Sequence, residues 1–236
     1  MANNFFSFKQ FTIYQDRCAF KVGTDGVLLG ACANVSGAKN ILDIGTGTGL
    51  IALMLAQRSE ADIVAIEPDA DSFWQACSNV NLSKWKERIR VLKKNLQDFD
   101  PETQRFDLIV SNPPFFSDSL KNPDKSKAAV RHNDSLKNED LLKGVNRLLA
   151  TGGRLQVIMP YAEGNIFIAE AQEYGLYCNN ILKIKPLPTS EVRRLILTFS
   201  RQKQKTSETF LTIEHGKRHE FTEEYKNLTK DFYLKF

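Results

Sequence analysis

A run of alternating glycines near the start of the chain has the residue types and the spacing of a ligand-binding turn. Residues 43–50 read DIGTGTGL, and the acid and the glycines of this run are Asp43, Gly45, Gly47 and Gly49. Glycines at a strand-to-helix turn let the backbone approach a ligand closely, because no Cβ intervenes. The dinucleotide fingerprint G-x-G-x-x-G would require glycine at position 50, which is Leu50. The run therefore predicts a ligand site and argues against an NAD-dependent oxidoreductase.

A second acidic residue, Glu67, directly follows an apolar run downstream of the glycines. A carboxylate at the end of the second strand of an α/β fold can accept hydrogen bonds from both ribose hydroxyls of a nucleotide-like ligand. The simpler alternative is an ordinary acidic residue that leads into a helix. The spacing of about twenty residues from the glycine run favours the ribose role.

A proline-containing run, Asn112-Pro113-Pro114-Phe115, follows a further apolar segment. As a local signal it only terminates a strand, because proline cannot continue the hydrogen-bonded ladder. Its expected position is the carboxyl end of a central strand, beside the glycine run, where open α/β sheets bind their ligands. We therefore interpret it as part of the same site.

These two runs resemble motifs of a known class of enzymes. The first is similar to motif I of class I methyltransferases, and the second to the (D/N/S)-P-P-(Y/F/W) motif of amino-methyltransferases. The resemblance implies S-adenosylmethionine as the cofactor. This molecule has no phosphate and carries a cationic sulfonium and ammonium, so the acidic Asp43 at a strand end would be favourable for it.

The residue types of the second run suit methyl transfer to an amino group on an sp² carbon, which is a poor nucleophile because its lone pair is delocalised. The side-chain oxygen of Asn112 and the backbone carbonyl of Pro113 can each accept one of its hydrogens, which draws the nitrogen toward tetrahedral geometry. The prolines, Pro114 included, preorganise these acceptors. Phe115 offers a face on which a flat base can stack, a contact worth about 1–3 kcal/mol.

The elements that must position these residues follow from the alternation of β-branched apolar runs with amphipathic stretches. This alternation is typical of an α/β fold in which helices cover a parallel sheet. The resemblance implies its Rossmann-like form, with a seven-stranded mostly parallel sheet and helices on both faces. The predicted strands are Asn40–Ile44, Asp62–Ile66, Ile89–Leu92, Phe106–Val110, Arg154–Met159, Tyr177–Ile184 and Arg194–Phe199. The predicted helices are Leu50–Arg58, Ala70–Ser83, Asn138–Leu149 and Gly164–Tyr174.

The second of these helices carries apolar residues at helical spacing, namely Phe73, Trp74, Ala76, Cys77 and Val80. Such spacing predicts a face that packs into the core. We therefore interpret these aromatic residues as core residues rather than as a platform for stacking bases.

One methyltransferase domain is expected over residues 1–236. A strand at Phe210–Glu214 and a short helix at Thr222–Leu228 are predicted after the core. The expected parts are a cofactor-covering segment, a Rossmann-like core and a strand–helix extension, over 1–38, 39–200 and 201–236 respectively.

The opening segment narrows the resemblance to one family. Residues 8–15, with the pattern F-x-x-F-x-I-x-Q, and residues 20–30, FKVGTDGVLLG, resemble the bacterial tRNA1(Val) (adenine(37)-N6)-methyltransferase family. The resemblance implies that Lys21, Thr24 and Asp25 join the cofactor site, although Thr24-Asp25-Gly26 is by itself only a turn or helix-cap signal.

Asn95 follows the third predicted strand, where the methyltransferase pattern commonly has an aspartate that contacts the adenine amino group of the cofactor. The side-chain oxygen of Asn95 could accept the same hydrogen bond. We therefore include Asn95 in the expected cofactor site.

The family resemblance implies methylation of N6 of an adenine in tRNA, expected to be adenine 37 in the anticodon loop of tRNA1(Val). A flipped base would lie within a phosphate-binding rim of basic residues. The segment 117–135 is polar and without periodicity, which predicts a long loop of the kind that often forms a lid. The residues expected to bind substrate are Phe115, Phe116, Lys121, Arg131, His132, Arg193 and Arg194.

Two other functions share parts of this pattern. Release-factor glutamine N5-methyltransferases also use Asn-Pro-Pro, but they generally carry a helical domain before motif I, and here only about forty residues precede that motif. A catalytically silent, cofactor-binding RNA module is the third possibility, and the intact run from Asn112 to Phe115 argues against it.

The charge balance is mildly basic, with 32 lysines and arginines against 28 acids and a formal charge of +4. Such an excess does not by itself indicate nucleic acid, and a solvated surface usually explains basic runs. We nevertheless expect the basic residues after position 115, and those from Arg193 to Lys205, to meet tRNA phosphates.

The composition also excludes several kinds of site. No apolar run approaches the roughly 20 residues that span a bilayer, and the N-terminus lacks a signal-peptide pattern, so we expect a cytoplasmic protein that does not bind membranes. The four cysteines are scattered and are expected to be free thiols. His215 and His219 have a helical spacing but no accompanying ligand pattern, so no metal site is expected. The protein is expected to be a monomer.

Overall fold

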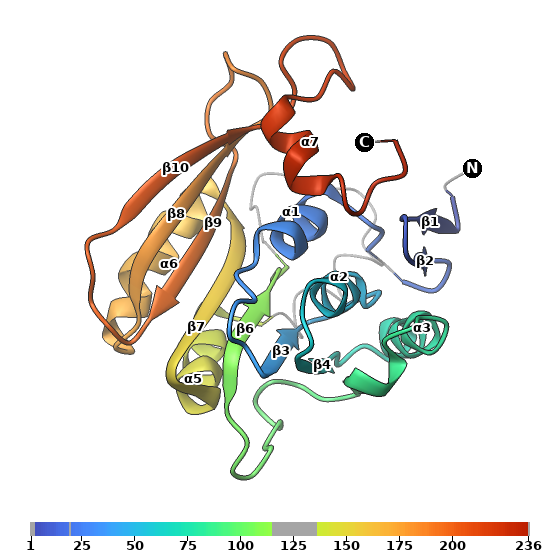
Figure 1. Cartoon of the computed structure of the whole chain (residues 1–236). Helices are drawn as coiled ribbons and strands as arrows, with labels where there is room; N and C mark the ends of the chain where they lie inside the picture. Colours follow the sequence, from blue (N-terminus) through green and yellow to red (C-terminus); the bar gives the residue numbers. More distant parts are fainter. Residues whose placement is uncertain (1–2, 19, 115–135, 236) are drawn as a thin grey trace, which may run out of the picture.

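The computed structural model describes residues 3–18, 20–114 and 136–235. Its central sheet contains eight strands, which are β3 Asn40–Ile44, β4 Asp62–Ile66, β5 Ile89–Leu92, β6 Phe106–Ser111, β7 Leu149–Pro160, β8 Tyr177–Lys185, β9 Arg194–Ser200 and β10 Ser207–Thr212. Their order is β10-β8-β9-β7-β6-β3-β4-β5, and only β9 runs antiparallel to its neighbours (Figure 1). The mostly parallel α/β sheet predicted from the sequence is confirmed.

The sheet has one strand more than predicted, because β10 pairs in parallel with β8 at the edge. The sequence predicts a strand at Phe210–Glu214 but places it outside the core sheet. Four of the six residues of β10 are exposed, from Ser207 to Phe210. An exposed edge strand lacks the buried apolar alternation that marks a sheet member, and this explains the difference.

Helices cover both faces of the sheet, as predicted. They are α1 Thr24–Cys32, α2 Leu50–Arg58, α3 Ala70–Asn81, α5 Asn138–Leu148, α6 Tyr161–Glu173 and α7 Glu223–Thr229, with a short 3₁₀ turn η1 at Lys86–Arg88. Successive residues of β3 point to opposite faces, so Ile41 packs with α1 and α2 whereas Leu42 packs with α5 and α6 (Figure 1).

A hairpin of β1 (Phe5–Ser7) and β2 (Thr12–Tyr14) precedes α1 and packs against the end of the chain. The backbone N–H of Lys9 donates to the carbonyl of Phe232 at 2.8 Å, and the ring of Phe8 stacks on that of Tyr233. The two described ends therefore lie side by side and join the core on the α1 and α2 face (Figure 1).

The burial of the aromatic residues on helix α3 differs from the prediction. Ala76 and Val80 are buried as expected, but Trp74 is 59% exposed. The inward stripe of the helix runs through Ser72, Ala76 and Val80, each four residues apart, and Trp74 lies off that stripe. The prediction that Trp74 is a core residue was wrong.

Candidate functional site

The turn between β3 and α2 is shaped by three glycines in the left-handed region. Gly45, Gly47 and Gly49 have φ values of 72°, 57° and 83°. A Cβ on Gly45 or Gly47 would meet no atom within 4 Å, whereas one on Gly49 would lie 3.6 Å from Ala76. The turn therefore packs closely on α3 at its last glycine and leaves open space above the first two. Such a cradle suits a ligand held against the backbone, which fits the nucleoside and methionine groups of S-adenosylmethionine.

Asp43 lies beneath this turn and is fully buried. Its Oδ2 accepts the hydroxyl of Thr46 at 2.6 Å, whereas Oδ1 has no hydrogen-bond partner among the residues described. Burial raises the pKa of the Asp43 carboxyl to about 7, although the Thr46 hydroxyl acts in the opposite direction. The Asp43 carboxyl thus holds the glycine turn from beneath through Thr46.

Glu67, the residue after β4, forms a hydrogen bond with the glycine turn. Its Oε2 accepts the N–H of Gly47 at 2.8 Å, and its Oε1 accepts the N–H of Asp69 at 3.0 Å. Burial raises the pKa of Glu67, and these two N–H groups partly offset the shift. Each carboxylate oxygen has a second lone pair, so Glu67 can still accept ribose hydroxyls. The structure brings two predicted cofactor residues, Glu67 and Gly47, into direct contact.

The Asn-Pro-Pro run leaves β6 beside the same turn. The last residue of β6, Ser111, pairs with Ile44 of β3, and its hydroxyl donates to the Ile44 carbonyl at 3.0 Å. Asn112 follows Ser111 and Gly45 follows Ile44, so the two predicted motifs begin at neighbouring positions of the sheet edge. Asn112 is half-buried and Pro113 is buried, whereas Pro114 is exposed. The expected site residues Phe115, Phe116, Lys121, Arg131 and His132, and the predicted loop 117–135, lie outside the described residues.

Helix α1 lies over the same edge and is joined to it by an ion pair. The Nε of Arg194 donates to Oδ2 of Asp25 at 2.8 Å. Arg194 begins β9 and pairs with Pro160 at the end of β7, which places it at the carboxyl edge of the parallel strands. Arg193, next to it, is exposed. A residue expected to bind cofactor, Asp25, is therefore in contact with one expected to bind substrate, Arg194.

Three further expected cofactor residues have few contacts. Lys21 is exposed and its Nζ donates to the carbonyl of Asn3 at 3.3 Å. Thr24 is exposed at the first position of α1. Asn95 is exposed in the chain after β5, and its Nδ2 lies 3.4 Å from Oδ2 of Asp98. All three side chains are accessible to a ligand.

Asn79 of α3 belongs to this region and was not predicted. Its Nδ2 donates to the carbonyl of Thr48 in the glycine turn at 2.8 Å and to the carbonyl of Tyr14 at 2.9 Å. The side chain is 1% exposed. The sequence signal that could have found it is a polar residue directly before the apolar Val80 on the inward side of the helix, where a buried amide needs hydrogen-bond partners.

The basic group from Arg193 to Lys205 is divided by the fold. Because β9 crosses the sheet antiparallel to β7, Arg193 lies at the carboxyl edge whereas Arg201, Lys203 and Lys205 follow Ser200 at the other end of the strand. A seven-residue strand separates the two ends by about 20 Å. Arg201 there bonds to Asn146 of α5. The basic residues expected to meet tRNA phosphates therefore lie at two separate edges of the sheet.

Other kinds of site are not seen in the described part of the chain. Over residues 3–18, 20–114 and 136–235, no group of three or more His, Cys, Asp or Glu side chains could hold a metal ion. All four cysteines are free thiols, as predicted. Among the helices that the structure describes, none is long and apolar enough to cross a membrane.

Comparison with known proteins bears on the family and the fold of this chain. Residues 20–165 match the methyltransferase small domain family. The chain is 48% identical to the tRNA1(Val) (adenine(37)-N6)-methyltransferase of Trichodesmium erythraeum over the whole of both chains, and 50% identical to that of Phocaeicola vulgatus over 99% of both. A predicted O-methyltransferase from Agrobacterium tumefaciens has a similar structure, with a TM-score of 0.65 and 21% identity over 88% of this chain and 96% of its own. A TehB-like methyltransferase from Corynebacterium glutamicum gives a TM-score of 0.52 and 22% identity, over 78% and 90%. These two structures bear on the fold alone.

Proposed function

Because the chain belongs to the tRNA1(Val) (adenine(37)-N6)-methyltransferase family and is an S-adenosylmethionine-dependent enzyme, we propose that it methylates N6 of adenine 37 in tRNA1(Val). The observation that carries the proposal is the Ser111–Ile44 hydrogen bond. It fixes the start of the Asn-Pro-Pro run beside the glycine turn, so that an amino group held by the first would face a ligand held by the second.

The cofactor would be held by residues around the glycine turn. The open space above Gly45 and Gly47 admits it, and Glu67 accepts its ribose hydroxyls. When bound, S-adenosylmethionine supplies an electrophilic methyl group and becomes S-adenosylhomocysteine. The remaining residues proposed to contact it are Lys21, Thr24, Asp25, Asp43, Gly49 and Asn95.

Asn112 and Pro113 would prepare the adenine amino group. The Asn112 side-chain oxygen and the Pro113 carbonyl each accept one N6 hydrogen, which reduces delocalisation of the nitrogen lone pair into the ring and aims it at the methyl group. Both acceptors are neutral, so they do not remove a proton before transfer. The nitrogen becomes cationic as the methyl group is transferred and then releases its proton to water, so no strong base is required. Phe115 would stack on the base, and Pro114 would fix the turn that carries it.

The ends of the chain would serve the same site. We propose a single domain in which residues 1–38 cover the cofactor, 39–200 form the core and 201–236 support the N-terminal segment. The contact of Asn79 with both Tyr14 and Thr48 supports this division, because it ties the N-terminal segment to the glycine turn. We further propose that the protein acts on tRNA as a monomer in the cytoplasm.

The test is to incubate the protein with labelled S-adenosylmethionine and tRNA that lacks the modification. Digestion and mass spectrometry should find N6-methyladenosine in the anticodon-loop fragment of tRNA1(Val). Release factor serves as a parallel substrate, because glutamine methyltransferases share the Asn-Pro-Pro run. Label in the release factor and none in tRNA would overturn the proposal.

A further inference from the structure

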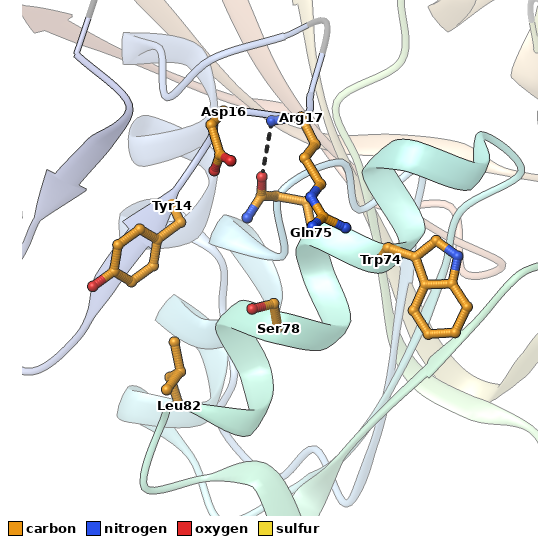
Figure 2. Close-up of a pocket in the computed structure, with 7 residues that line it drawn as sticks. All are labelled: Tyr14, Asp16, Arg17, Trp74, Gln75, Ser78 and Leu82. Carbon is orange, nitrogen blue, oxygen red and sulfur yellow. Dashed lines mark hydrogen bonds between the residues drawn. The ribbon is translucent and has the colours of Figure 1, made fainter.

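A shallow pocket of about 260 Å³ lies between helix α3 and the segment that follows β2 (Figure 2). One wall is the outward face of α3 and its C-cap, where Trp74, Ser78 and Leu82 follow one another at intervals of four residues and therefore lie on one side. The other wall is the chain from Tyr14 to Arg17. Trp74, Leu82 and Tyr14 are 59%, 69% and 42% exposed. Three large exposed side chains thus line the pocket, with Tyr14 and Leu82 on one side and the Trp74 indole on the other (Figure 2).

Two buried amides hold the walls of the pocket together. The Oδ1 of Asn79 accepts the N–H of Tyr14 at 2.9 Å, and its Nδ2 donates to the Tyr14 carbonyl at 2.9 Å. The Oε1 of Gln75 accepts the N–H of Arg17 at 3.1 Å (Figure 2). These contacts use only backbone atoms of the segment. The pocket should therefore keep its shape when the exposed side chains that line it are replaced.

The pocket is directly connected to the cofactor turn. The Asn79 nitrogen that binds the Tyr14 carbonyl also donates to the carbonyl of Thr48 at 2.8 Å, and Thr48 lies between the last two glycines of the turn. Helix α3 begins at Ala70, just after Glu67. The pocket therefore lies beside the glycine turn, at the rim of the proposed cofactor site.

The chemistry of the lining suits a nucleotide. Trp74 and Tyr14 present flat faces on which a base can stack, and the guanidinium of the exposed Arg17 can bind a phosphate or stack in turn. Asp16 also lines the pocket, and its carboxylate can accept hydrogen bonds from the exocyclic amino group of a base. A purely phosphate-binding surface would exclude such a carboxylate, whereas a pocket that holds a base and its phosphate uses both charges.

We propose that this pocket binds an unpaired nucleotide of the tRNA anticodon loop, next to the adenine that enters the catalytic site. The proposal rests on the proposed function, because methylation of that adenine brings the loop to this rim. When the target base leaves its stack, a neighbouring base loses a stacking partner. Trp74 supplies a replacement for that partner.

Fluorescence offers a direct test, because the chain has only two tryptophans and Trp85 is buried. Titration of an anticodon stem-loop RNA into the protein should quench the Trp74 emission when a base stacks on the indole. Trp74→Phe should abolish the quench while keeping most of the RNA affinity, since a flat face remains. S-adenosylmethionine alone should leave the Trp74 emission unchanged, because it binds at the glycine turn.

Binding assays complete the test. Trp74→Leu should weaken tRNA binding about tenfold and leave cofactor binding unchanged. Phe210→Leu is the matched control, because Phe210 is an aromatic residue of similar exposure, 61%, on the edge strand β10. It should bind tRNA as the wild type does. Wild-type tRNA affinity of Trp74→Leu, or an unquenched Trp74 in the RNA complex of an enzyme that still methylates tRNA, would overturn the pocket proposal. Failure of the wild type to methylate tRNA would overturn the proposed function and this proposal with it.

Discussion

Asp25 and Arg194 form an ion pair with a 2.8 Å contact between Oδ2 and Nε, although 169 residues separate them in the sequence. Their side chains are 27% and 35% exposed, so the pair lies partly within the protein. It connects the first turn of α1 to the beginning of β9, at the edge of the sheet that carries the glycine turn. The pair therefore orients α1 over the proposed cofactor site.

This relationship predicts that the two residues act as a unit. Arg194→Gln and Asp25→Asn should each weaken S-adenosylmethionine binding severalfold, because a partly exposed ion pair contributes on the order of 1 kcal/mol. The double variant should bind the cofactor with the same affinity as the single variant that binds it less tightly. Calorimetric titration measures the three affinities. Lys226→Gln, which breaks the pair with Glu223 on α7, is the control and should bind the cofactor normally. Additive losses in the double variant would show that the residues act separately.

Asp43 predicts a pH-dependent stability of the cofactor-free protein. Its pKa is raised to about 7 from an ordinary value of about 4, so the folded state retains a proton that the unfolded state loses. The stability contributed by this carboxyl is therefore present at low pH and is lost as pH rises from about 4 to above 7. Asp43→Asn keeps an acceptor for Thr46 but cannot ionise.

Urea unfolding of the wild type and of Asp43→Asn at several pH values measures this effect. The free energy of unfolding of the variant should improve relative to the wild type as pH increases from 5 to 8. The control is Asp98→Asn, which changes an exposed carboxylate beyond β5. A difference between Asp43→Asn and the wild type that is constant with pH would contradict the assignment of the raised pKa to Asp43.

The division of the basic residues predicts an uneven salt dependence of tRNA binding. Log affinity should fall linearly with log salt concentration, and Arg193→Gln should reduce the slope by about one, because Arg193 lies at the catalytic edge. Lys203→Gln and Lys205→Gln, near the opposite edge, should leave the slope unchanged. Filter binding across a salt series distinguishes the two groups. Equal effects of all three substitutions would show instead that both edges of the sheet contact tRNA phosphates.

The sequence predicted those parts of the site whose signal is local. The strands β3, β4 and β6 are buried apolar runs, and the glycine turn, Glu67 and Asn112 directly follow them, so pattern alone located these residues at one edge. Helix α1 was not among the predicted helices, because its glycines lower the helix propensity of this segment. In the structure Gly26 and Gly30 face Leu50 and Met54 of α2, and a side chain at Gly30 would lie 2.6 Å from the Met54 sulfur. These glycines permit close packing of two helices.

Contacts between distant segments could not be predicted from spacing. The Asp25–Arg194 pair depends on β9 running antiparallel, which no local pattern of β9 indicates. The exposure of Trp74 depends on where the hairpin of β1 and β2 lies, because that hairpin meets α3 through Tyr14 and Asn79 and stops short of the indole. Helical spacing alone predicts which side of α3 is apolar, but it does not predict how much of that side is covered by other segments.

The most direct test of the account is single-turnover methylation of tRNA1(Val) by Asn112→Ala. Removal of one preorganised hydrogen-bond acceptor should slow N6-methyladenosine formation at position 37 at least about a hundredfold, whereas the dissociation constant of S-adenosylmethionine should stay within about twofold of the wild type. Asn112→Asp keeps an acceptor oxygen and should retain more activity than alanine. Methylation by Asn112→Ala at the wild-type rate, or a loss explained by weaker cofactor binding alone, would contradict the role of Asn112 in activating the adenine amino group.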